Sequence, residues 1–276
     1  MKAENSEEAK GRREGRVLLE REPGDRSVAI LSFDHAARRN AVSVSMWRDL
    51  GSACAEVAQD PELRCLVVRG AGDEAFVSGA DISEFGTVRS GAENERAYEQ
   101  ISGGAMAALA ALELPVVALI HGFCIGGGAA IALACDLRYA AEDAVFAIPA
   151  ARLGLGYSQG GVETLVNLVG GARAKEIFFT TRRYTAEEAL GMGLIEAVFP
   201  KHELDAEVRA LTKRIVSNAP LTLRAVKRAV RESQRDPARR DPAAMQAAID
   251  ACFESEDYRE GVRAFLEKRP PRFRGR

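Results

Sequence analysis

The sequence predicts an α/β fold with a largely parallel sheet, followed by a mainly helical C-terminal region. Short apolar runs typical of buried strands alternate with helical patterns over the first part of the chain. From residue 162 onward helical patterns dominate, and one short strand-like run at 197–199 interrupts them. With 276 residues and 47% hydrophobic content, the chain can bury one large core or two modest ones. We expect a charged, disordered tail at 1–16, an α/β body at 17–200 and a helical region at 201–276.

The elements of the body follow from hydrophobic periodicity. Residues 28–33 and 65–69 are short apolar runs that predict buried strands. Residues 43–58 have the spacing of a helix, with Trp47 on its apolar face. The polar and charged segment 86–104 predicts a mobile lid with some helix. Further strands are predicted at 114–120, 136–140 and 144–148, and further helices at 105–112 and 129–135.

The C-terminal region consists of amphipathic helical patterns, one of which begins with Pro220, a residue suited to the first turn of a helix. Because these patterns are amphipathic, we expect the helices to pack on the body or on a neighbouring subunit. The predicted helices cover 162–169, 174–180, 186–192, 203–217, 221–234 and 242–253.

Three consecutive glycines, Gly126–Gly128, lie between a predicted strand and a predicted helix. Backbone N–H groups at a helix start carry partial positive charge, and the missing side chains expose them. The junction therefore predicts an anion or oxyanion site made of backbone. It matches neither a dinucleotide fingerprint, because Ala129–Ile131 lacks the third glycine, nor a P-loop, because no Gly-Lys-Ser/Thr follows. Close packing of helix on sheet remains an alternative explanation for the glycines.

A second motif, Gly156–Gly160, matches the Gly-x-Ser-x-Gly elbow of serine hydrolases, with Ser158 at the nucleophile position. That elbow needs a strand directly before it and an acid and a histidine after it. Residues 150–154 look like a loop instead, and His202 is the only histidine downstream. A serine hydrolase is thus a weaker alternative.

The three histidines and five cysteines show no spacing typical of a metal site, and we expect none. His121 ends a predicted strand, where it is either a general base or hydrogen-bonded to nearby loop backbone. His35 and His202 are expected to face solvent. The cysteines are odd in number and mostly lie in apolar context, which predicts buried free thiols in a reducing compartment: Cys54, Cys65, Cys124, Cys135 and Cys252.

The charge balance excludes several classes of partner. A formal net charge of -2 provides no field for nucleic acid or an anionic membrane, and 6% aromatic residues do not suggest a stacking platform for single strands. The charged N-terminus lacks the apolar core of a secretory signal, and no apolar stretch is long enough to span a bilayer. We expect a cytoplasmic protein that binds neither nucleic acid nor membrane.

Two segments together resemble the signatures of a known family. They are Ala75-Phe-Val-Ser-Gly-Ala80-Asp-Ile-Ser-Glu-Phe85 and the run from Leu114-Pro-Val-Val-Ala through the glycines to Ala-Cys-Asp136-Leu-Arg. Both resemble the crotonase superfamily, also called the enoyl-CoA hydratase/isomerase family. The order and spacing of further motifs extend the likeness over nearly the whole chain from Val28: Phe146-x-x-Pro149, Leu153–Leu155, Gly160–Gly161, Thr185–Ile195, Asn218–Pro220 and Glu256–Gly261.

The resemblance implies a crotonase-like core of spiral ββα turns, with C-terminal helices that mediate a homotrimer or a hexamer of two trimers. It implies an acyl-CoA substrate, which brings coenzyme A with it, and no tightly bound cofactor. By motif position, the backbone N–H groups of Ala80 and Gly127 would bind the thioester oxygen as an oxyanion hole. Other positions expected to contact the substrate are Arg38, Arg39, Gly79, Asp81, Ile82, Gly126, Ala130, Ala150 and Lys268. If the charged stretch around Lys268 does not contact the ligand, the alternative is that it is a solvated tail.

The chain departs from the family pattern at the acid–base positions. Hydratases of the family carry two glutamates, at the positions of Ala130 and Ala150 here, and a methyl group cannot move protons. A decarboxylase branch of the family carries a tyrosine at the position of Tyr157. The alternative is that Tyr157 only lines the pocket as an amphipathic side chain. Three hypotheses follow: an enzyme that stabilises a thioester enolate, a malonyl- or methylmalonyl-CoA decarboxylase, and a non-catalytic acyl-CoA-binding protein. Three other acids lie near the loops that match the family. Asp81 is expected to cap its own turn, Glu163 is expected to lie on a helix surface, and the third is Glu84.

Overall fold

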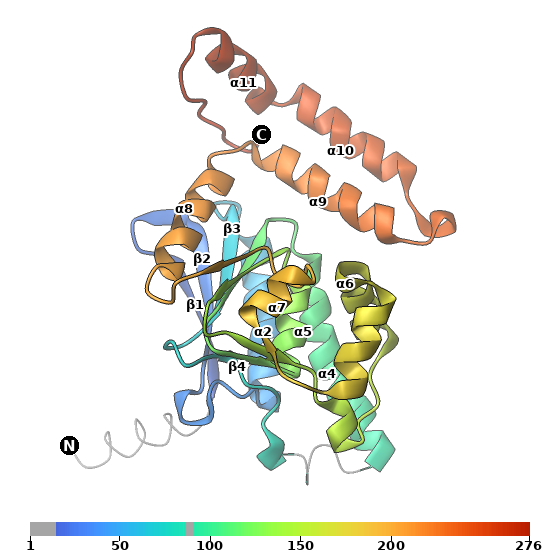
Figure 1. Cartoon of the computed structure of the whole chain (residues 1–276). Helices are drawn as coiled ribbons and strands as arrows, with labels where there is room; N and C mark the ends of the chain where they lie inside the picture. Colours follow the sequence, from blue (N-terminus) through green and yellow to red (C-terminus); the bar gives the residue numbers. More distant parts are fainter. Residues whose placement is uncertain (1–14, 85, 87–90) are drawn as a thin grey trace, which may run out of the picture.

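The computed structural model describes residues 15–84, 86 and 91–276, and it confirms the α/β prediction. Helices surround two sheets, and a helical arm extends from this body at the C-terminal end (Figure 1). The larger sheet has the strand order β1-β2-β3-β5-β7-β10. Its strands are β1 (Arg16–Glu22), β2 (Asp25–Asp34), β3 (Cys65–Gly70), β5 (Val116–Ile120), β7 (Leu137–Ala141) and β10 (Ala197–Phe199).

The predicted parallel pairing holds from β2 through β10, whereas β1 pairs with β2 as an antiparallel hairpin. Strand β1 was not predicted, because charged residues interrupt its apolar ones. Gly24, with φ +87°, makes the tight turn of the hairpin. The predicted tail at 1–16 is therefore wrong at its end, since Arg16 already pairs with Asp34 across the hairpin. Residues 1–14 lie outside the described part of the chain.

The smaller sheet positions the loops that carry the predicted site. Strands β4 (Ala75–Val77), β6 (Phe123–Ile125) and β8 (Val145–Ala147) are parallel, and β9 (Tyr184–Thr185) pairs antiparallel with β8. Strands β4 and β6 were not predicted, because three residues are too short for a periodic pattern. Since the three strands are parallel, their carboxyl ends lie at one edge of the sheet, where α/β proteins commonly bind ligands.

Two apolar clusters lie on the two faces of the larger sheet. The main cluster packs under α2 (Val44–Gln59), α4 (Gly91–Ala111), α5 (Gly127–Ala134), α6 (Gln159–Thr180) and α7 (Ala186–Gly191). The predicted helices at 162–169 and 174–180 are joined in α6, with a break at Gly170, whose φ is +78°. The lid predicted at 86–104 is helical from Gly91 onward, and residues 85 and 87–90 of this region lie outside the described residues.

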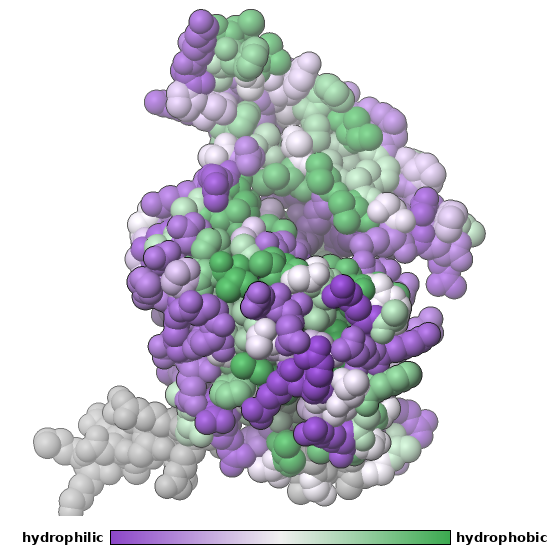
Figure 2. Space-filling view, viewed as in Figure 1, coloured by the Kyte–Doolittle hydropathy of each residue, from purple (hydrophilic) through white to green (hydrophobic). Residues whose placement is uncertain are grey.

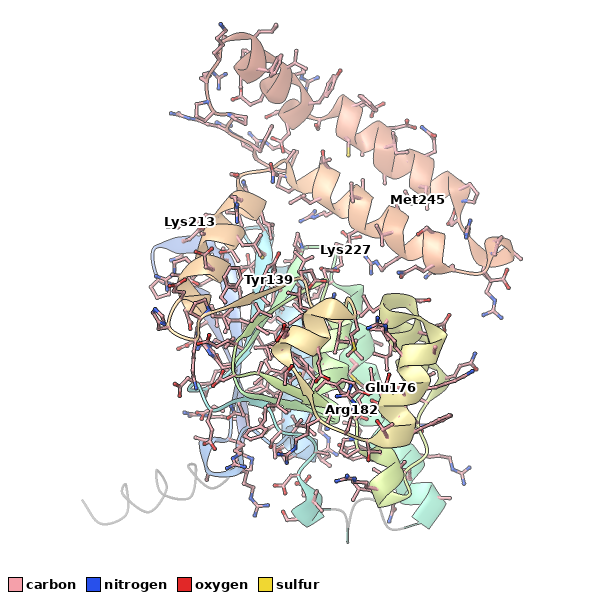
Figure 3. All side chains as sticks on the ribbon, viewed as in Figure 1. Tyr139, Glu176, Arg182, Lys213, Lys227 and Met245 are labelled. Carbon is pink, nitrogen blue, oxygen red and sulfur yellow. The ribbon has the colours of Figure 1, made fainter. Side chains whose placement is uncertain are left out.

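The C-terminal helices are α8 (Leu204–Val216), α9 (Pro220–Gln234), α10 (Pro242–Glu254) and α11 (Glu256–Leu266). Helix α8 covers the second apolar cluster, whereas α9–α11 form the arm. Lys227 of α9 docks the arm on the body through Asp136 (2.6 Å) and the Leu114 carbonyl (2.9 Å) (Figure 3). Within the described residues, no helix is both long enough and apolar enough to cross a bilayer.

The arm carries apolar side chains that its own chain does not cover (Figure 2). Exposed apolar patches of this kind mark sites of protein association. The homotrimer or hexamer expected from the family resemblance would use such a surface, and it stays a prediction. The exposed apolar residues include Val226, Ile249, Phe253, Phe265 and Leu266.

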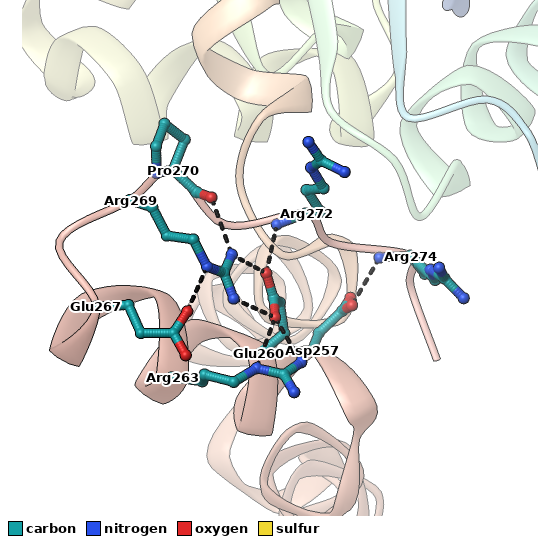
Figure 4. Close-up of polar contacts among 8 residues, drawn as sticks. All are labelled: Asp257, Glu260, Arg263, Glu267, Arg269, Pro270, Arg272 and Arg274. Atoms are coloured by element: carbon teal, nitrogen blue, oxygen red, sulfur yellow. Dashed lines mark hydrogen bonds and ion pairs between the residues drawn. The ribbon is translucent and has the colours of Figure 1, made fainter.

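The chain end after α11 is bound to that helix by charged groups (Figure 4). The buried carboxylate of Asp257 accepts hydrogen bonds from the Arg274 and Gly275 amides, at 2.6 and 2.7 Å. Glu260 pairs with Arg269 and Arg263, and these partners hold the pKa of its carboxyl well below the ordinary range. The charged stretch 259–276 is thus ordered by contacts between α11 and the chain end, and its alternative role in holding a ligand stays a prediction.

The histidine expectations need two corrections. His35 is buried, and its Nδ1 lies 2.9 Å from the Ala41 carbonyl oxygen, so it does not face solvent. His121 is also buried, but its Nε2 lies 2.9 Å from Asp205 Oδ2 on α8 rather than bonding to loop backbone. Sequence spacing could not reveal that partner, which is 84 residues away. The prediction for His202 is confirmed, and four of the five free cysteines are buried, all except Cys252.

Asp205 links α8 to the sheet, since its other carboxylate oxygen pairs with Arg69 at 2.5 Å. The hydrogen bond with His121 and the charge of Arg69 outweigh partial burial and lower the pKa of Asp205 to about 2. The fold therefore favours the carboxylate form. The Asp205 carboxylate therefore contributes to the free energy of unfolding above pH about 3.9, the pKa of an aspartate in the unfolded chain. This contribution is lost as the pH falls toward 2.

Replacing Asp205 with asparagine should lower the free energy of unfolding modestly at pH 6, because the carboxylate is half exposed. Urea unfolding at pH 6, 5, 4 and 3 would measure the difference between Asp205→Asn and the wild type. The difference should be constant at the two higher pH values and shrink at the two lower ones. A difference that stays the same down to pH 3 would show that the charge of Asp205 does not stabilise the fold.

Candidate active site

The predicted site residues lie on loops that leave the smaller sheet at its carboxyl edge. Strand β4 leads to Gly79 and Ala80, and strand β6 leads to Gly126 and Gly127. A Cβ atom built on Gly127 would lie 3.5 Å from the Ala80 nitrogen and 3.7 Å from the Gly79 carbonyl carbon. The two loops are therefore in close contact through their backbones, although almost fifty residues separate them in the sequence.

In the described part of the chain, the backbone around Ala80 and Gly127 is hydrogen-bonded, whereas the amides of these two residues are not. Val42 brackets Ala80, because its N–H donates to the Gly79 carbonyl (2.8 Å) and its carbonyl accepts from the Asp81 N–H (2.9 Å). Gly127 is the first residue of α5, where an N–H has no partner within the helix. Within the described residues, neither the Ala80 nor the Gly127 amide donates a hydrogen bond. Two adjacent, partly exposed donors of this kind can bind one oxygen atom.

Two of the three glycines have separate structural explanations, and the third has none. Gly126 has φ +52° and ψ -108°, a backbone conformation that favours glycine. Gly128 allows α5 to lie directly on β4, since a Cβ atom there would be only 2.1 Å from the Val77 carbonyl oxygen. Gly127 needs neither explanation: its φ is not positive, and its Cβ atom would meet ordinary contacts of 3.4 Å or more. Packing therefore explains Gly128, and it does not explain Gly127.

One aromatic residue, Trp47, lies near Gly127 and was not predicted as a site residue, and a second, Tyr98, is hydrogen-bonded to it. The Cζ2 atom of Trp47, on α2, would lie 3.4 Å from a Cβ atom on Gly127. The Trp47 indole N–H donates to the hydroxyl oxygen of Tyr98, on α4, at 2.8 Å. Both side chains are buried. The apolar periodicity of α2 predicted that Trp47 is buried, but nothing in the sequence indicated that it lies beside the Gly127 loop.

The acids near the matching loops are engaged in local structure. Asp81 accepts hydrogen bonds from the Ser83 N–H (3.0 Å) and hydroxyl (2.7 Å) and pairs with Arg38 (2.7 Å). Although partial burial opposes it, the Ser83 hydrogen bonds and the Arg38 charge lower the pKa of Asp81. Glu84 accepts from the Val44 N–H at the start of α2, at 2.9 Å. Glu163 is exposed on α6.

Not all of the cations expected to contact coenzyme A lie near the loop that carries Ala80. Arg38 and the exposed Ile82 flank the loop that carries Ala80. Arg39 pairs with Glu74 at 2.6 Å, and its guanidinium lies over the Phe123 ring. Lys268 follows α11, which lies at the opposite end of the molecule from β4 (Figure 1). The fold of one chain thus does not bring Lys268 to the Ala80 loop.

The remaining predicted positions are Ala130, on α5, and Ala150 and Tyr157, which come after β8. Ala130 lies in the first turn of α5, and the buried Ala150 begins a 3-10 turn after β8. Tyr157 packs its ring against Phe178 at a centroid distance of 4.8 Å, and burial raises the pKa of its hydroxyl. Among the described residues, that hydroxyl has no hydrogen-bond partner. The ring of Tyr157 is therefore a packing group, whereas its hydroxyl has no partner among the described residues.

The serine-hydrolase alternative is not supported. The segment before Ser158 is a 3-10 turn, Ala150–Leu153, followed by irregular backbone, rather than the strand that a nucleophile elbow requires. His202 is 81% exposed and pairs with the adjacent Glu203. In the part of the chain that the structure describes, no group of three His, Cys, Asp or Glu side chains could hold a metal ion.

Comparison with known proteins identifies similar chains over nearly the full length. Residues 24–276 match the family model described as enoyl-CoA hydratase/isomerase. The chain is 33% identical to the short-chain-enoyl-CoA hydratase of Clostridium acetobutylicum, covering 92% of this chain and 95% of that protein. It is 33% identical to the crotonyl-CoA hydratase of Syntrophomonas wolfei, covering 93% and 97%. A crystal structure of an enoyl-CoA hydratase/carnithine racemase from Magnetospirillum magneticum superposes with a TM-score of 0.87 at 34% identity, covering 94% and 96%.

Proposed function

Because this chain belongs to the enoyl-CoA hydratase/isomerase family of the crotonase superfamily, we propose that it stabilises the enolate of an acyl-CoA thioester between the amides of Ala80 and Gly127. The observation that carries this proposal is the contact between two loops whose adjacent N–H groups have no partner among the described residues. Coenzyme A enters as part of the substrate.

The chemistry follows from where charge develops. When a proton or carbon dioxide leaves the carbon next to a thioester carbonyl, the bonding electron pair stays behind and places negative charge on the carbonyl oxygen. Preorganised N–H donors stabilise that charge, and removal of one such donor costs about 3–4 kcal/mol of transition-state stabilisation. Gly127 adds the positive end of α5 to this effect. The same donors would bind a ground-state thioester more weakly, which is the condition for catalysis.

The named relatives are hydratases, but alanine at 130 and 150 favours a reaction that needs no carboxylate base. Decarboxylation of a malonyl-type thioester is the second candidate, because breaking the bond to carbon dioxide forms the enolate without removal of a carbon-bound proton. The Tyr157 hydroxyl, which has no partner in the described structure, supports this candidate as a group that orients the carboxylate or returns a proton.

A panel of enoyl-, malonyl- and methylmalonyl-CoA substrates tests these proposals. Release of carbon dioxide with negligible hydration would support the decarboxylase. Hydration of the enoyl thioester at rates typical of the family would overturn it. Binding of several thioesters without any turnover would support a non-catalytic acyl-CoA-binding protein instead.

Replacing Tyr157 with phenylalanine should lower kcat for decarboxylation roughly 100-fold, the effect typical of a group that transfers or orients a proton. Because the ring still packs against Phe178, the melting temperature should change little. Carbon dioxide release and thermal unfolding measure the two quantities. An unchanged kcat would leave Tyr157 as a wall residue only.

We also propose that the chain acts as a homotrimer or hexamer whose contacts include the apolar surface of α9–α11. Sedimentation equilibrium of the full chain measures the assembly directly.

A further inference from the structure

Helix α2 is connected to both loops of the amide pair. At its start, Val42 pairs with the backbone on either side of Ala80, at 2.8 and 2.9 Å. Glu84, which follows the same loop, accepts a hydrogen bond from the Val44 N–H at the first turn of the helix. One turn later, Trp47 reaches the other loop, where its Cζ2 atom would lie 3.4 Å from a Cβ atom built on Gly127. A single rigid helix therefore spans from the first amide to the second.

The orientation of the Trp47 ring is set by one buried hydrogen bond. Trp47 is 2% exposed, and its indole has only one donor, which is bonded to Tyr98 Oη at 2.8 Å. A buried N–H that loses its acceptor is costly, so the ring favours the rotamer in which this bond is made. Tyr98 lies on α4, which packs along α2 through the main apolar cluster. The bond thus links the ring that supports Gly127 to a second helix.

The close contact at Gly128 limits how α5 can respond. Because α5 lies directly on β4 there, the helix cannot move toward the strand. It can still rotate or move away from the strand, and Trp47 Cζ2 is the atom nearest to the position that a Cβ atom on Gly127 would take. Removal of this support would change the direction of the Gly127 N–H without breaking the fold.

We propose that Trp47 is a positioning residue that holds the Gly127 amide in register with the Ala80 amide, and that Tyr98 fixes Trp47 in place. This inference rests on the proposed function, because it gives Trp47 and Tyr98 the role of aligning the two amides toward the thioester oxygen. Neither side chain is assigned contact with the reacting atoms. Misalignment by a fraction of an ångström weakens both the hydrogen bond and the stabilisation of charge.

Infrared spectra of bound acetyl-CoA labelled with carbon-13 at the carbonyl test the proposal. Two aligned donors polarise the thioester carbonyl and move its band to lower wavenumber than in free acetyl-CoA. In Tyr98→Phe, the hydroxyl that accepts from Trp47 is lost, and we expect the band shift to fall to less than half of the wild-type shift. For a substrate that is turned over, kcat should fall roughly 10-fold with KM within about 3-fold. Trp47 is the only tryptophan of the chain, so its fluorescence measures binding of acetyl-CoA in both proteins.

Tyr139→Phe is the matched control, since Tyr139 packs with Phe199 against the second apolar cluster, away from α2. It should retain the full band shift. Trp47→Phe should reduce the shift as Tyr98→Phe does, and circular dichroism shows whether each variant is folded. Folded Tyr98→Phe protein that keeps the full shift and full kcat would overturn the positioning role while leaving the proposed function intact. Absence of any shift in the wild type would instead overturn the amide pair itself, and this inference with it.

Discussion

Replacing Gly128 with alanine is expected to destabilise the protein by about 3 kcal/mol or more, and to leave much of it insoluble on expression. The added Cβ atom would lie 2.1 Å from the Val77 carbonyl oxygen and 2.9 Å from the Val77 Cβ atom. Val77 is fully buried in β4, and the clash involves backbone, so no side-chain rotation relieves it. Helix α5 would have to move off the sheet and leave unfilled space in the main core.

Gly104→Ala is the control for this prediction. Gly104 lies inside α4 with open space around its Cα, so alanine should stabilise the helix by about 0.5–1 kcal/mol. Urea unfolding of the wild type and both variants measures the free energies. A Gly128→Ala variant as stable as the wild type would show that α5 and β4 are not in the close contact described.

Replacing Gly127 with alanine is expected to have the opposite profile: a stable protein with little or no activity. The new methyl group would make ordinary contacts, 3.4 Å from Trp47 and 3.5 Å from the Ala80 nitrogen, so the free energy of unfolding should change by less than about 1 kcal/mol. The methyl group would nevertheless occupy space next to the Ala80 N–H, where the thioester oxygen must approach. We expect kcat/KM to fall roughly 100-fold or more, as for removal of one oxyanion donor.

Gly51→Ala is the matched control, because Gly51 also lies in a helix and has open space around it. It should keep full turnover. Steady-state kinetics on the substrate found by the thioester panel, together with thermal unfolding, separates a loss of activity from a loss of fold. A Gly127→Ala variant with wild-type kcat/KM would show that the thioester oxygen does not bind at this pair of amides.

The predicted crotonase fold is confirmed by the family match and by the solved structures that superpose on this chain. The long periodic elements were predictable, because a helix such as α2 repeats its apolar pattern over several turns. The short strands β4 and β6 were not, because each has three residues and is held by pairing with its neighbours rather than by its own pattern. Helix α4 was predicted as a full helix only at 105–112, with some helix before it, because its first turns are polar.

Of the two amides, only that of Gly127 could be located from a local sequence pattern. Three glycines at a strand–helix junction indicate exposed N–H groups wherever they occur, because the partial charge at a helix start belongs to the local backbone. The partner amide at Ala80 came from family resemblance, since nothing local distinguishes that residue.

The sequence alone thus specified the long helices and the strands with longer apolar runs, it predicted an anion site at the Gly126–Gly128 junction, and it has no carboxylate at 130 or 150. The folded molecule added what depends on distance between remote residues: the contact of Gly127 with Ala80, the support of Trp47 by Tyr98, and the pairing of His121 with Asp205. Sequence patterns report on neighbours within a few residues, whereas these contacts join segments that meet because distant strands pair in sheets and distant helices pack together.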